Sequence, residues 1–138
     1  MDKKEVEYEK GNIDNVPIKE SLFVIFDKNN EFFIMSSHKD VGMKIPGMIG
    51  NNHSIEELNR QMGLKVEKIE YVGRMKTYRD GKARYIENLY MGKLEEKTRE
   101  KHNIYTMSVE DFELYLSFYP EESLYVPLVE KAYQQFKI

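Results

Sequence analysis

The chain has 138 residues, a net charge of −3 and no cysteine. This length suits one domain with a sizeable core, and the slightly acidic charge argues against general nucleic-acid binding, which needs a basic surplus. Without cysteine, neither a disulfide nor a thiol nucleophile is available. No apolar run approaches the roughly twenty residues that span a bilayer, and the charged N-terminus lacks the apolar core of a signal peptide. We therefore expect a soluble, cytoplasmic protein with no membrane partner.

The first strands are predicted near the N-terminus. Residues 1–17 are polar, and Val6 and Tyr8 alternate with charged residues, which favours at most an edge strand. We place a single domain over residues 18–138. The apolar run at residues 21–26 is typical of a central strand that is covered on both faces. The turn residues DKNN and the run EFFIMSS predict a second strand, in a hairpin with the first.

A short helix is predicted between two groups of strands, within PGMIGNNHSIEELNRQMGL at residues 46–64. Ser54 is a good N-cap, and Glu57 three residues later predicts a capping box in which each side chain satisfies a backbone donor. Gly63 is suited to the left-handed conformation that ends a helix. Three apolar residues fall on one face of this helix: Ile55, Leu58 and Met62.

The remaining elements follow from alternation and turn residues. Residues 65–78 and 83–94 read as long strands in the middle of the sheet, joined by the hairpin turn RDGK, and residues 102–107 as a short strand. Ser108 caps a helix with Asp111 in a second capping box, and its buried side takes Val109, Phe112, Leu116 and Leu114. A final helix follows Pro120, and Pro127 predicts that this helix starts near it or bends there.

This order of elements resembles the Nudix family, which cleaves nucleoside diphosphates linked to another group. The resemblance rests on the hairpin, the proline-glycine loop, the short helix ending in Gly-Leu and the flanking strands. The closing helices are similar to those of the isopentenyl-diphosphate-isomerase-like branch. The resemblance covers residues 18–138 and implies an α/β/α sandwich with a mixed curved sheet. The short helix at residues 54–62 would lie on one side of this sheet and the C-terminal helices on the other. The resemblance also implies a homodimer, because Nudix-like domains often pair.

The family's sequence box is shortened and degenerate in this chain. It ends in Arg-Glu-aliphatic-x-Glu-Glu-x-Gly-aliphatic, and alignment on Gly63 and Leu64 matches Leu58 and Glu57. The family arginine falls on Glu56, and the paired glutamates, which hold magnesium in the family, fall on Arg60 and Gln61. Magnesium needs several oxygen ligands, and only Glu57, with Glu56 beside it, remains. The sequence thus argues against magnesium-dependent hydrolysis by the family mechanism.

Basic residues near the box are candidates for phosphate binding. The Arg60 guanidinium could replace the metal's positive charge and grip a diphosphate, or it could form a surface ion pair with Glu56 or Glu57. The linker lysines Lys39 and Lys44 could contact a diphosphate, with His53 across the loop, or they could simply be solvated.

Two residues of the long hairpin complete the candidate site. The aromatic ring of Tyr85 could stack on a base. Glu87 lies between apolar residues of its strand, and it could face a pocket as a ligand or base. Alternatively, Glu87 pairs across the hairpin with Arg74 or Lys76, which is the simpler interpretation.

The leading hypothesis is a divergent Nudix-fold protein that binds a nucleotide or other diphosphate-containing compound, with hydrolysis weak or absent. One alternative is an active magnesium-dependent hydrolase of a nucleoside diphosphate derivative. It would use Glu56, Glu57 and Glu87 as a rearranged carboxylate site. The other alternative is a non-catalytic protein-interaction or regulatory module.

Overall fold

A mixed β-sheet forms the middle layer of the protein. The computed structural model describes residues 2–8, 16–36 and 42–138. Within them, strands lie in the order β1-β6-β7-β2-β3-β4, while β5 pairs with β2 and β8 with β3. The pairing of β2 with β7 is parallel, and the other pairings are antiparallel. The strands are β1 (Asp2–Glu7), β2 (Ile18–Phe26), β3 (Phe32–Ser36), β4 (Met43–Lys44), β5 (Gly47–Ile49), β6 (Leu64–Arg79), β7 (Lys82–Lys97) and β8 (Ile104–Met107).

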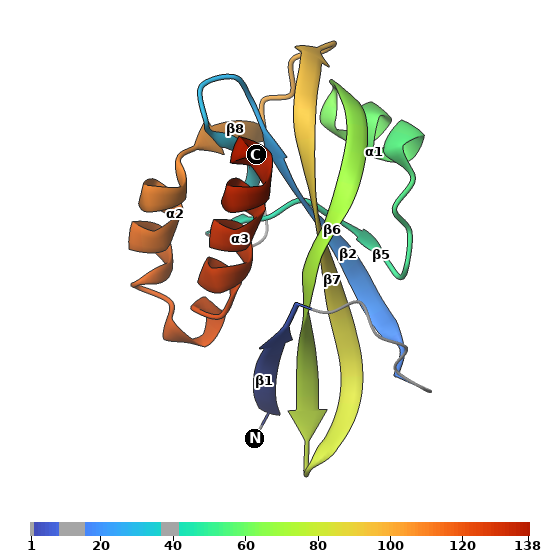
Figure 1. Cartoon of the computed structure of the whole chain (residues 1–138), viewed down its shortest axis with the longest axis vertical. Coiled ribbons are helices and arrows are strands. Elements are labelled where there is room, and N and C mark those ends of the chain that lie inside the picture. Colours follow the sequence, from blue (N-terminus) through green and yellow to red (C-terminus); the bar gives the residue numbers. More distant parts are fainter. Residues whose placement is uncertain (1, 9–15, 37–41) are drawn as a thin grey trace.

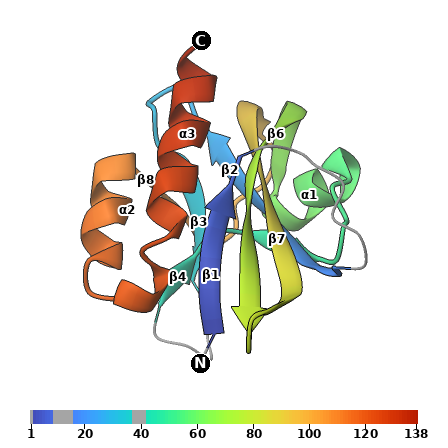
Figure 2. The ribbon, with the colours of Figure 1, turned by 60° about the horizontal axis from the view of Figure 1, so that its bottom comes forward.

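Helices cover both sides of this sheet, as Figures 1 and 2 show. Helix α1 (Ile55–Met62) lies on one side, and α2 (Val109–Leu116) and α3 (Tyr125–Lys137) lie on the other. A short 3-10 helix, η1 (Pro120–Glu122), precedes α3. The predicted α/β/α sandwich with a mixed sheet is therefore confirmed. Among the described residues, no helix is both long and apolar enough to cross a membrane.

Each side of the sheet has its own apolar core. Beneath α1, Leu58 and Met62 pack against Phe23, Ile25 and the strand residues around them. Beneath α2 and α3, Leu22 and Val24 of the same strand contribute to a larger core with Phe112, Leu116 and Leu128. Successive residues of β2 thus point to opposite cores, and this double burial explains its continuous apolar sequence.

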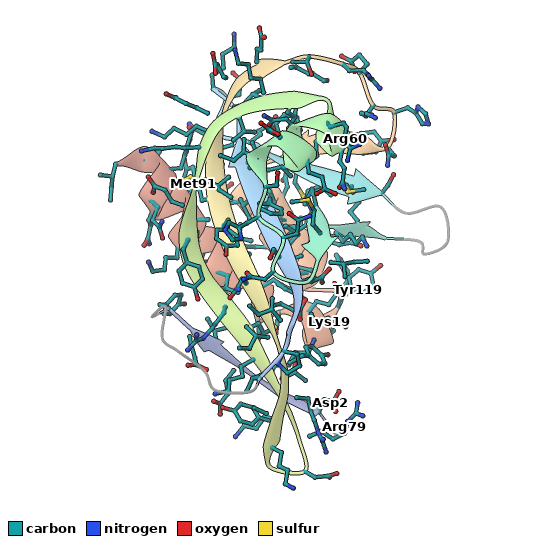
Figure 3. The ribbon with its side chains drawn as sticks, turned by 90° about the vertical axis from the view of Figure 1, so that its right-hand side faces the viewer. Asp2, Lys19, Arg60, Arg79, Met91 and Tyr119 are labelled. Carbon is teal, nitrogen blue, oxygen red and sulfur yellow. The ribbon has the colours of Figure 1, made fainter. Side chains whose placement is uncertain are left out.

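The long β6–β7 hairpin turns as its sequence predicts. Asp80 and Gly81 at the tip both have positive φ angles, of 53° and 78°, as a tight two-residue hairpin turn requires. β1 pairs with β6 at the edge of the sheet. Near the tip, Arg79 donates to Asp2 at 2.8 Å, and Figure 3 shows these two side chains together.

The structure corrects two of the predictions. The linker before α1 carries two short strands, β4 and β5, in its described part. Leu114, expected on the buried side of α2, is 63% exposed. Pro127 is the third residue of α3, where its missing N–H needs no intrahelical acceptor, so the helix starts near it, as predicted.

Candidate functional site

Helix α1 begins with a network that differs from the predicted capping box. The Ser54 Oγ accepts the Glu57 N–H at 3.3 Å, as expected. The second half of the box is wrong, because the Ser54 N–H donates to Asn52 Oδ1 at 3.1 Å. The Glu57 carboxylate instead accepts from Asn52 Nδ2 at 2.6 Å. Asn52 therefore occupies both groups that the capping box would have joined.

The donors on α1 do not fit a magnesium ion. One Glu57 oxygen is engaged by Asn52, and the other lies 3.9 Å from the Arg60 guanidinium. Among residues 2–8, 16–36 and 42–138, no three acidic or histidine side chains converge as metal ligands. Magnesium requires near-octahedral oxygen coordination, usually from carboxylates together with substrate phosphates. A cation beside the remaining carboxylate would oppose such binding.

Arg60 and His53 are both accessible on the α1 side of the sheet. The Arg60 side chain is 77% exposed and forms the predicted surface ion pair with Glu57. Figure 3 shows Arg60 on α1, well apart from Lys19 on β2. The exposed ring of His53 stacks on the buried ring of Tyr90, with centroids 5.4 Å apart.

A cavity of about 190 Å³ lies on the opposite side of the sheet, between β2, β4, α2 and the start of α3. We call it the Glu20 cavity. Its apolar wall consists of Leu22, Met43, Ile45, Phe112 and Leu116. Its polar groups are Glu20, Tyr125 and the exposed side chains of Lys44 and Glu122.

Two carboxyl groups meet beside this cavity because of the parallel strand pairing. Glu20 of β2 and Glu87 of β7 are direct partners in the register, and their side chains share a hydrogen bond. Glu87 is only 4% exposed and accepts a hydrogen bond of 2.9 Å from the Tyr125 hydroxyl. The hairpin register places Glu87 opposite Met75, and Arg74 pairs with Glu7 at 3.0 Å. The cross-strand ion pair predicted for Glu87 is therefore wrong.

Burial and mutual repulsion make this carboxyl pair hold a proton. The pKa of Glu20 rises from 4.5 to about 7, first because burial penalises its charge and then because Glu87 lies beside it. Lys44 and Lys19 act in the opposite direction and lower the pKa of Glu20. Burial, followed by the adjacent Glu87, raises the pKa of Tyr125. Tyr125 thus remains a hydrogen-bond donor at physiological pH.

The loop before α1 closes one side of the cavity. A Cβ on Gly47 would come within 2.8 Å of Leu22 Cδ2 and 3.3 Å of Glu20 Oε2. Glycine therefore allows β5 to lie directly against β2 at the carboxyl pair. On the other side, the Met43 N–H donates to the Tyr115 hydroxyl of α2 at 2.9 Å. The residues around Lys44 are thus held between β2 and α2.

The predicted site residues divide between the two sides of the sheet. Glu56, Glu57, Arg60 and His53 belong to α1 or the loop before it, whereas Lys44 lines the cavity and Glu87 adjoins it. The structure does not bring Glu87 together with Glu56 and Glu57. Lys39 lies outside the described residues.

The Tyr85 ring is half-buried, and the Lys19 ammonium lies 4.6 Å from its centroid. The ring of Tyr85, which was predicted to stack on a base, thus already has a cation–π contact with Lys19.

The sequence analysis missed Glu20 and Tyr125. Glu20 had a usable signal, since it precedes Leu22 by two residues and must share its face of the strand. A carboxylate on the apolar face of a central strand is expensive to bury and indicates a site. Tyr125 had no comparable signal, because its partner Glu87 is distant in the sequence.

Comparisons with known proteins support the fold. No protein-family model matches the sequence, and a search of curated proteins finds no relative. Among solved structures, a mutant of the Bacillus subtilis pyrophosphohydrolase RppH is similar, with a TM-score of 0.55 and 14% identity over 75% of this chain and 70% of that one. The C. elegans Ap4A hydrolase has a TM-score of 0.55 and 15% identity over 88% of this chain and 98% of that one. The chain thus has the Nudix fold that the resemblance implied.

Proposed function

We propose that this Nudix-fold chain binds a nucleotide or another diphosphate-containing compound, and that its hydrolysis of such compounds is weak or absent. The observation that carries the proposal is the Glu20 cavity, which has an apolar wall, a carboxyl pair and Lys44. A concave, mostly apolar site with a few converging polar groups and a perturbed pKa is the usual form of a small-molecule site.

The size of the cavity limits which part of the compound it can hold. Its volume of about 190 Å³ is below the roughly 300 Å³ at which pockets begin to bury drug-sized ligands. One ring-sized group fits, so the diphosphate remains outside. There the exposed Lys44 offers a positive charge. Arg60, predicted as a second cation, lies in a weak ion pair on the other side of the sheet, so Lys44 is the cation that a ligand in this cavity would meet.

The positions of the carboxylates support weak or absent hydrolysis. Glu57 is engaged by Asn52 and lies near Arg60. Glu87 bonds to Tyr125 of α3, on the other side of the sheet. The rearranged carboxylate site of the alternative hydrolase would need Glu56, Glu57 and Glu87 around one point, and the described residues contain no such group.

A thermal-shift screen, followed by titration calorimetry of each hit, tests this proposal. The compounds are nucleoside diphosphates, dinucleotides and isoprenoid diphosphates, each with and without magnesium. A ligand at 100 times its Kd stabilises the folded state by about 2.7 kcal/mol, which raises Tm by several degrees. We expect at least one hit without magnesium, and a loss of affinity of about tenfold in Lys44→Ala if its ammonium pairs with phosphate. Lys82→Ala, at the exposed tip of the hairpin, is the matched control.

Three outcomes would overturn the proposal or part of it. If no compound shifts the transition, the binding proposal is wrong and the interaction module becomes the better account. The exposed Leu114 and Phe118 would then be the first surface to test. A hit that requires magnesium and is turned over would instead support the alternative hydrolase. If Lys44→Ala and Lys82→Ala change the affinity for a hit equally, the ligand does not bind at the Glu20 cavity.

Three further features stay predictions. Membership of the isopentenyl-diphosphate-isomerase-like branch and a homodimer rest on the resemblance, and a cytoplasmic location rests on the sequence composition. Size-exclusion chromatography with light scattering tests the homodimer directly, since a dimer would have about twice the chain mass of 16.5 kDa.

A further inference from the structure

We infer that the group entering the Glu20 cavity is a neutral heterocycle that presents an amino group or adjacent N–H donors to the carboxyl pair of Glu20 and Glu87. This inference rests on the proposed function and deepens it, because it names the chemical class of the ligand's non-phosphate part. The inference follows from a comparison of the hydrogen-bond donors and acceptors at the polar end of the cavity.

The polar end has more acceptors than donors. An ionised carboxylate is an acceptor only, with about four lone-pair sites. The Tyr125 hydroxyl supplies one donor, to Glu87, and the hydrogen bond between Glu20 and Glu87 uses one shared proton. The Glu20 carboxyl lines the cavity directly. A bound group with N–H donors would satisfy the acceptors that these two contacts leave.

The two nearby lysines do not supply the missing hydrogen-bond donors. Lys19 lies over the Tyr85 ring, and Lys44 is exposed at the cavity. In the described part of the chain, neither lysine comes within ion-pair distance of Glu20, although both favour its charge.

The chemistry of the cavity excludes other ligand parts. A phosphate would meet the carboxyl pair and be repelled, so the diphosphate does not enter. A purely apolar group such as an isoprenoid tail would fit the wall formed by Leu22, Phe112 and Leu116, but it would offer no donor to the Glu20 carboxyl group that lines the cavity. A planar amino-substituted ring satisfies both the apolar wall and the carboxyl pair.

Proton release should accompany binding of such a ring. N–H donors favour the ionised form of the pair, so the ligand lowers the raised pKa of Glu20 and its affinity increases as the pH rises from 6 to 8. The other charged or titratable groups near Glu20 are Glu87 on β7, Lys44 on β4, Lys19 on β2, and Glu122 and Tyr125 at the start of the α3 region. The pKa of Glu20, raised to about 7, lies in this pH range.

Titration calorimetry with two matched ligand pairs tests the inference. GDP and IDP differ by one exocyclic amino group, and CDP has an amino group where UDP has a carbonyl. We expect the amino-bearing member of at least one pair to bind about tenfold more tightly, since a charged acceptor strengthens the hydrogen bond. The preference should fall below about twofold in Glu20→Leu. It should persist in Glu96→Gln, an exposed residue of β7. Glu20→Gln, which keeps the side-chain shape, should abolish proton release measured in buffers of different ionisation enthalpy.

The outcomes separate this inference from the proposed function. If the diphosphates bind without preference, or if the preference survives in Glu20→Leu, the inference is wrong and the proposed function stands. If guanosine or cytidine binds with the expected preference but no diphosphate improves on it, the donor inference stands and the diphosphate proposal is wrong. If neither nucleosides nor diphosphates bind, both are wrong.

Discussion

Replacing Glu20 by glutamine should stabilise the protein at pH 8 and leave its stability unchanged near pH 4.5. The pKa of Glu20 is 4.5 in the unfolded chain and about 7 in the folded protein. The folded state therefore retains a proton that the unfolded state loses, and stability falls as the pH rises from 4.5 through 7. The full shift corresponds to roughly 3 kcal/mol. Because solvent partly screens Glu20, we expect a loss of about 2 kcal/mol.

Urea denaturation followed by circular dichroism would measure this effect at intervals between pH 4.5 and pH 8. Glutamine resembles the protonated carboxyl group, so the free energy of unfolding of Glu20→Gln should exceed that of the wild type by about 2 kcal/mol at pH 8. Acid unfolding driven by other carboxylates, such as Glu7 with its lowered pKa, affects both proteins equally and cancels in the difference.

The exposed Glu96→Gln variant is the control, and its difference from the wild type should stay near zero at every pH. A difference for Glu20→Gln that does not change with pH would refute the reasoning. It would mean that Glu20 binds protons equally in the folded and unfolded states, so its pKa is not raised by folding. The proton release that the donor inference expects on ligand binding would then have no source in Glu20.

Two other substitutions test the α1 side of the fold by urea denaturation, each with a control substitution elsewhere. Gly63→Ala should cost about 2 kcal/mol or more, because its φ is +66° and its Cβ would meet a backbone oxygen at 2.6 Å. Gly81→Ala, with φ +78° but open space, should cost only about 1 kcal/mol, and equal losses would contradict the steric argument. Leu58→Ala should cost about 3 kcal/mol since Leu58 is 1% exposed. Leu114→Ala, at 63% exposed, should cost below about 0.5 kcal/mol, and a similar cost for both leucines would contradict the assignment of the core.

Most of the elements could be predicted from the sequence because their signals are local. The α1 boundaries follow from Ser54, which caps the first turn, and Gly63, which adopts the left-handed conformation. The β6–β7 hairpin follows from Asp80 and Gly81, whose positive φ angles match the turn. In each case, residues a few positions apart determine the geometry.

The candidate site was harder to predict because it depends on pairing between distant strands. Glu20 meets Glu87 only through the parallel register of β2 and β7, and no turn residue encodes that register. The register of the β6–β7 hairpin also determines the partners of Glu87. It places Met75 opposite Glu87, and Arg74 forms an ion pair with Glu7 instead. The second half of the predicted capping box failed for a local reason. Asn52, just outside the four-residue motif, bonds to both groups that this half would have joined.

The loop before α1 joins the cavity to the helix that carries Arg60, but the cavity and this helix lie on opposite sides of the sheet. Its Gly47 lies against Glu20 at the cavity, and its Ser54 begins α1 on the other side. A compound held in the cavity would therefore meet Lys44, which lines it, and not Arg60. A nucleotide-like compound has an anionic diphosphate and a neutral ring that offers donors, and these two parts match Lys44 and the carboxyl pair. The proposed binding would thus depend on the cavity side of the sheet alone.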